Sequence, residues 1–173
     1  MSDFPDVDEP GQIDAAPGSG LAALRGKRAH TVQSIHLDLP VQRSEEIFGQ
    51  VVYVRYRPYT DPERRRLAKR FEKRKDAEAD LVSNAVLLGQ CTLGVFTAVE
   101  RDTPDDWMHM DRDLAALLLG VDEGDPALKP IESAADVVQL LYVTNGDLMA
   151  TAAKLSEWTG YSLEDLEEAD SGN

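Results

Sequence analysis

The sequence TDPERRRLAKRFEKRKDAEADLVSNAVLLG (residues 60–89) has a pattern that predicts one long helix, around which the other predicted elements are arranged. Asp61 is suited to accept hydrogen bonds from the free N–H groups of the first turn, and Pro62 fits the first helical position. A capping box that begins at Thr60 is the alternative start. Neither glycine nor a second proline follows before residue 89, so we expect a continuous helix over residues 62–88, about 40 Å long at roughly 1.5 Å per residue.

The first half of this predicted helix is crowded with Lys and Arg side chains at helical spacing. Each exposed like-charged pair of this kind costs roughly 0.2 to 0.5 kcal/mol, so a sequence tuned only for helix stability would mix the signs. We therefore expect the basic face to meet something acidic. The candidate partner-binding residues are Arg65, Arg66, Lys69, Arg70, Lys73 and Arg74.

The charge of the whole chain is −14 and is unevenly distributed. Residues 1–54 sum to −4, residues 55–75 to +7 and residues 76–173 to −17. Three readings of the basic stretch follow, in order of preference: a surface neutralised within the chain, an acidic protein partner, and nucleic acid. Nucleic acid comes last because the chain is acidic overall and Phe71 is the only aromatic residue among the arginines.

A small β element is predicted before the long helix. Residues 31–40 and 50–59 are rich in β-branched and aromatic residues, and a proline closes each run, which predicts two antiparallel strands. In the second strand Val52, Val54 and Tyr56 share one face. Residues 93–99 fit either a short strand or a buried loop.

Helices are predicted again in the C-terminal half. Asp111 or Asp113 caps a helix that stops at Gly120, and Ser133 begins a further helix. A turn at residues 145–146 leads to a last helix, which ends at Gly160. Its apolar stripe consists of Leu148, Ala152, Leu155 and Trp158.

These elements predict a mainly α fold with a small antiparallel β element (α+β), in which a C-terminal helical hairpin packs on the long central helix. Residues 1–28 are rich in Asp, Pro, Gly and Ser, and we expect a flexible arm there. Residues 29–161 form a single mostly helical domain, and residues 162–173 form an acidic tail. Without a signal peptide or a membrane-length apolar run, the sequence predicts a soluble cytosolic protein.

The residue types that support catalysis are sparse. His30, His36 and His109 are widely spaced, and no Cys-x-x-Cys or phosphate-binding glycine loop occurs, so we expect no metal and no cofactor. The single cysteine, Cys91, has apolar neighbours that predict a buried, inert thiol. Paired carboxylates such as Asp105 with Asp106 fit a solvated loop better than a catalytic pair. Because no cluster of catalytic groups is evident, we expect a non-enzymatic protein.

The order of these segments resembles the tail assembly chaperones of long-tailed phages, particularly those that infect actinobacteria. The resemblance covers about residues 30–168 and is carried by three segments: VYVRYRPYTDPERRRLAKRFEKR (52–74), LLGQCTLGVF (87–96) and VVQLLYVTNGDLMATAAKLSEWTG (137–160). That family has no invariant signature, so no residue role is transferred.

The resemblance implies a protein of the host cell cytoplasm that binds the phage tape measure protein and keeps it soluble before tail tube subunits polymerise. Self-association between the basic helix and the acidic tail at residues 164–170 is a further expectation. Two alternatives remain open: a structural virion component, such as a head-tail connector or minor tail protein, and a DNA-associated regulatory protein.

Overall fold

The computed structural model describes residues 34–74 and 76–160. The chain divides into two compact units, residues 1–35 and 36–173, and the elements described here belong to the second. The predicted arm at residues 1–28 and the predicted acidic tail at residues 162–173 lie outside the described residues.

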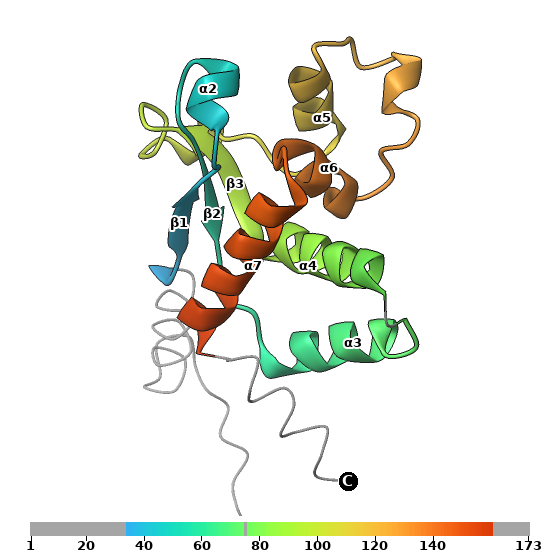
Figure 1. The fold of residues 1–173 in the computed structure, drawn as a ribbon. Helices are drawn as coiled ribbons and strands as arrows, with labels where there is room; N and C mark the ends of the chain where they lie inside the picture. The colour runs from blue at the N-terminus through green and yellow to red at the C-terminus, as the bar shows by residue number, and fades with distance from the viewer. Residues whose placement is uncertain (1–33, 75, 161–173) are drawn as a thin grey trace, which may run out of the picture. The chain divides into compact units, whose positions relative to one another are not determined.

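Within the described residues, six α-helices accompany one small sheet (Figure 1). The predicted α+β composition, mostly helical with a small antiparallel sheet, is confirmed. The elements are β1 (Leu37–Pro40), α2 (Ser44–Phe48), β2 (Val52–Tyr56), α3 (Asp61–Phe71), α4 (Ala77–Cys91), β3 (Thr92–Thr97), α5 (Arg112–Leu119), α6 (Ala134–Leu141) and α7 (Asn145–Thr159).

The sheet has three antiparallel strands in the order β1-β2-β3. Residues 93–99, for which the sequence fitted either a strand or a buried loop, therefore contribute to a strand, β3. On β2, Val54 and Tyr56 are buried and Val52 is half-buried, on the face predicted to be apolar. Gly94 lies within β3, where an added Cβ would come within 2.6 Å of the Trp107 ring. Glycine is required there because Trp107 lies against the strand backbone.

The predicted continuous helix over residues 62–88 is wrong, because the chain forms two helices, α3 and α4, separated by residues 72–76. The Asp76 carboxylate accepts the Ala79 N–H at 2.6 Å and caps a new helix. α3 contains no fully buried residue, so packing gives its crowded cations little compensation. The chain turns back after α3, and α3 lies beside α4 (Figure 1).

The ends of these two helices also differ from the first expectation. Thr60 is the N-cap of α3 and forms a capping box with Glu63, so the alternative start is the observed one. α4 continues through Gly89 to Cys91. A Cβ at Gly89 would lie 3.1 Å from the Ala134 Cβ, so the glycine permits α4 to approach the start of α6 closely.

The C-terminal helices largely follow their predicted caps. Asp111 caps α5, Ser133 caps α6, and Gly120 and Gly160 end α5 and α7 in the left-handed conformation. The predicted turn at residues 145–146 is wrong, since these residues form the first turn of α7 and the Thr144 hydroxyl accepts its Asp147 N–H at 3.1 Å.

The core joins the sheet to the helices of the second unit. α4 contacts both α6 and α7, and α7 also contacts β1. Of the stripe predicted on α7, three residues are buried, whereas Trp158 is half-buried and packs against the edge of the core. Tyr56 and Tyr142 meet inside this core, with their hydroxyl oxygens 2.6 Å apart.

Candidate partner-binding surface on α3

The start of α3 is fixed by an ion pair with the end of the sheet. The Arg57 guanidinium donates to both oxygens of the Glu63 carboxylate, at 2.7 and 3.1 Å, and also to the Gln90 carbonyl of α4 at 3.1 Å. The same carboxylate accepts the Thr60 N–H at 2.8 Å. Glu63 thus orients α3 relative to β2 and α4.

This arrangement changes the acidity of Glu63. The hydrogen bond from Arg57, helped by the bonds from Thr60, lowers the Glu63 pKa from 4.5 to about 2, although partial burial opposes the shift. Because the pKa is lower in the folded state, the ion pair contributes stability above about pH 4.5, and this contribution is lost as the pH falls towards 2.

We expect Glu63→Gln to lower the free energy of unfolding near neutral pH by about 1 kcal/mol, since the pair is partly solvated. The difference between the variant and the wild type should shrink as the pH falls from 4.5 to about 2. Urea unfolding at several pH values measures both quantities. A difference that stays constant over this pH range would show that the Glu63 charge is not the source of the stability.

The six predicted partner-binding residues are all exposed, but they do not all lie on one helix. Arg65, Arg66, Lys69 and Arg70 belong to α3, whereas Lys73 and Arg74 follow its end in the turn before α4. The structure therefore divides the predicted continuous basic face into a helical part and a turn.

Only two of the six cations have a carboxylate partner within the described part of the chain. Arg65 pairs with Asp61 at 2.8 Å, and Arg74 approaches Asp76 at 4.0 Å. Among residues 34–74 and 76–160, no carboxylate lies within ion-pair distance of the other four, which are Arg66, Lys69, Arg70 and Lys73. Four of the six cations therefore make no ion pair with the described residues.

A hollow of about 210 Å³ adjoins two of these four cations. Arg66 and Arg70, one helical turn apart, line it together with Leu67, Gln90 and Glu63. The two guanidinium groups suit planar carboxylates, and Leu67 adds an apolar surface between them. The arrangement is suited to hold an acidic side chain together with part of its apolar neighbour.

Potential metal ligands are not clustered within the described residues. These residues contain no group of three or more His, Cys, Asp and Glu side chains placed to hold a metal ion. Cys91 is buried as predicted, and burial raises the pKa of its thiol to about 12, which keeps it protonated. In the same part of the chain, no helix has the length and apolar character needed to cross a membrane.

Sequence reasoning missed a second surface, formed by exposed apolar side chains of α2 and α5. Phe48 and Leu117 lie 69 positions apart in the sequence, yet both line one apolar hollow. The only local signals were an Ile-Phe pair in a polar loop and a leucine run broader than one helix face.

No protein-family model, curated protein sequence or solved structure matches the chain. The charge and the geometry of the α3 surface therefore carry the functional proposal.

Proposed function

We propose that the protein is a non-enzymatic tail assembly chaperone of a long-tailed phage. It binds the tape measure protein in the host cell cytoplasm and keeps it soluble before the tail tube polymerises. The observation that carries this proposal is the group of four exposed cations, Arg66, Lys69, Arg70 and Lys73, without a carboxylate partner in the described residues. The resemblance of residues 30–168 to that family supplies the identity of the partner.

The partner chemistry follows from the hollow beside α3. Arg66 and Arg70 stand four residues apart, as carboxylates do when they recur on one face of a partner helix. A single exposed ion pair contributes only about 0 to 1 kcal/mol, so binding requires several pairs together. An acidic helical segment of the tape measure protein provides such a series, and Leu67 receives an apolar side chain from it.

A competing occupant is the acidic segment at residues 164–170 of a second copy. It carries five carboxylates in seven residues and would produce head-to-tail self-association. Both kinds of contact weaken as salt screens the charges. The two complexes differ in composition, because the self-associated complex contains only copies of this chain.

We expect the double variant Arg66→Glu/Arg70→Glu to lose at least tenfold in affinity for the tape measure protein while remaining folded. The matched control is Lys129→Glu/Lys154→Glu, which changes the net charge equally at exposed positions outside α3. The chain and the candidate tape measure protein are co-expressed, the soluble fraction is measured, and the complex is recovered on a tag. Equal recovery with both double variants would exclude the α3 surface as the contact.

The remaining alternatives predict different results. A structural virion component is found by mass spectrometry in purified particles, whereas a chaperone is absent from them. A DNA-associated protein shifts labelled DNA at low salt, and that binding falls steeply as salt is added. Sedimentation of the isolated chain at low and high salt detects self-association.

A further inference from the structure

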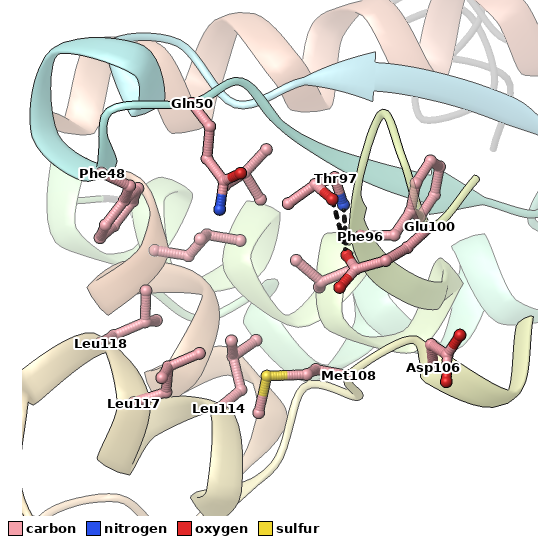
Figure 2. Close-up of a pocket in the computed structure, with 13 residues that line it drawn as sticks. Phe48, Gln50, Phe96, Thr97, Glu100, Asp106, Met108, Leu114, Leu117 and Leu118 are labelled. Atoms are coloured by element: carbon pink, nitrogen blue, oxygen red, sulfur yellow. Dashed lines mark hydrogen bonds between the residues drawn. The ribbon is translucent and has the colours of Figure 1, made fainter. Parts of the chain in front are cut away.

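A second surface lies between α2, the sheet and α5, where a hollow of about 310 Å³ opens to solvent. Figure 2 shows Phe48 and Gln50 on one side of it, with Leu114, Leu117 and Leu118 on the other. Val52, Val95, Phe96, Met108 and Leu141 also contribute to its lining, so most of its wall is apolar. It shares no lining residue with the hollow beside α3.

Large apolar side chains at or next to the hollow are exposed. Leu117 is 66% exposed and Phe48 is 38% exposed, and Ile47 next to Phe48 is 49% exposed. Large side chains exposed together at the edge of a groove mark a contact surface more often than isolated ones do. The exposed parts of Phe48 and Leu117 are thus accessible to an occupant of the hollow.

The rim on the α2 side is fixed before any occupant arrives. The buried Ser44 hydroxyl donates to the Val41 carbonyl at 2.7 Å and accepts the Val52 N–H at 3.0 Å. Arg43, the residue before α2, pairs with Asp147 of α7 at 3.2 Å. Because α2 is held at both of these points, Phe48 is presented over a preformed groove, which reduces the entropy cost of binding.

Two of the four polar residues that line the groove, Thr97 and Glu100, bond to each other. The Glu100 carboxylate accepts the Thr97 N–H at 2.8 Å and the Thr97 hydroxyl at 2.9 Å (Figure 2). The Glu100 carbonyl accepts the Trp107 indole N–H at 2.6 Å. Small-molecule sites usually offer several convergent polar groups that orient the ligand. This groove instead offers apolar contact, which suits side chains from one face of a helix.

The segments that supply the groove are strongly acidic. Residues 44–48 and 97–119 carry eight Asp and Glu side chains against two arginines, Arg101 and Arg112. Arg101 is 3.8 Å from Asp38, so its charge is partly compensated elsewhere. An occupant with Lys or Arg beside its apolar stripe is therefore favoured, whereas one with acidic flanks is repelled.

We propose that this groove, between α2, β3 and α5, docks an amphipathic helix of a partner protein whose apolar face is flanked by Lys and Arg. The occupant differs in charge from the acidic segment proposed for α3, so the two surfaces select different segments. The groove proposal stands on its own contacts and does not depend on the function proposed for α3.

The test uses the full-length chain and three synthetic amidated peptides as probes. The first places leucines on one helical face with lysines on the flanks, and the second replaces those lysines by glutamates. The third has the composition of the first but a scrambled order, so that its leucines share no face. Titration of labelled peptide, followed by fluorescence anisotropy, gives each affinity. We expect the first peptide to bind at least tenfold more tightly than either of the others.

The protein variants separate groove binding from simple charge attraction. Leu117→Glu should weaken binding of the first peptide at least tenfold, although the added negative charge would strengthen a purely electrostatic attachment. The matched control, Val143→Glu, adds the same charge at an apolar position that is 56% exposed and outside the groove, and it should change the affinity less than twofold. Melting temperatures establish that both variants are folded.

Three results would overturn the proposal. They are equal affinities for the scrambled and amphipathic peptides, equal effects of Leu117→Glu and Val143→Glu, and a homodimer in sedimentation that Leu117→Glu dissociates. The last would assign the groove to a second copy of the chain. If the first peptide binds Arg66→Glu/Arg70→Glu as tightly as the wild type, the result supports the groove as the binding site. This result does not depend on the outcome of the test of the α3 surface.

Discussion

Replacement of Phe96 by alanine is expected to lower the free energy of unfolding by about 3 to 5 kcal/mol. Phe96 is 2% exposed and is stacked between two aromatic rings. Its ring centroid lies 4.6 Å from that of Trp107 and 6.0 Å from that of Tyr53. The Arg55 guanidinium adds a cation–π contact at 5.4 Å, so the truncation removes packing on several sides at once.

Phe48→Ala is the matched control for this prediction, since it removes the same atoms from a ring that is 38% exposed. We expect it to cost at most about 2 kcal/mol, because its ring is less completely buried than that of Phe96. Urea unfolding of both variants measures the two costs. Similar values would show that Phe96 is not packed as tightly as its stacked rings indicate.

The second large effect is expected from Tyr56→Phe, at about 1 to 3 kcal/mol. Tyr56 and Tyr142 are both buried, and their hydroxyl oxygens lie 2.6 Å apart. Burial raises the pKa of each phenol, so both hydroxyls remain protonated and one donates to the other. Removal of the Tyr56 hydroxyl leaves Tyr142 without this partner in a site from which water is excluded.

A double-mutant cycle tests whether the two hydroxyls stabilise the core as a pair. Tyr56→Phe/Tyr142→Phe should cost less than the sum of the single changes, because no hydroxyl is then left unpartnered. Tyr142 also interacts with the Thr151 side chain, so some cost should remain in the double variant. Additive costs, measured by urea unfolding, would mean that the two hydroxyls do not interact energetically.

Helix ends could be predicted from the sequence because they depend on local hydrogen bonds. Asp111 and Ser133 cap the helices that follow them, and Gly120 and Gly160 adopt the left-handed conformation that ends a helix. The break between α3 and α4 was missed because the absence of glycine and proline was taken to mean continuity. Asp76 competes with the helix for backbone N–H groups, and this signal was present in the sequence.

The exposure of the six basic residues was predictable, since their charge keeps them in water. The pair of Arg65 with Asp61 was open to prediction, since the two residues have i,i+4 spacing within α3. The surroundings of the other cations were not predictable, because they depend on where the chain turns after α3. The groove was missed for a similar reason. Its walls come from residues 48–52, 95–118 and 141, and only the folded chain brings these together.

The edges of the small sheet limit how another chain can attach. One edge is β1, which has four residues and ends in Pro40, a residue without an N–H donor. On the other edge, Val95 already exchanges both backbone hydrogen bonds with Met108, at 2.8 and 3.0 Å. As far as residues 34–74 and 76–160 show, neither edge offers a long run of free backbone groups for strand addition or for growth of an aggregate. The short, partly occupied edges thereby keep the sheet from serving as a template for amyloid-like stacking.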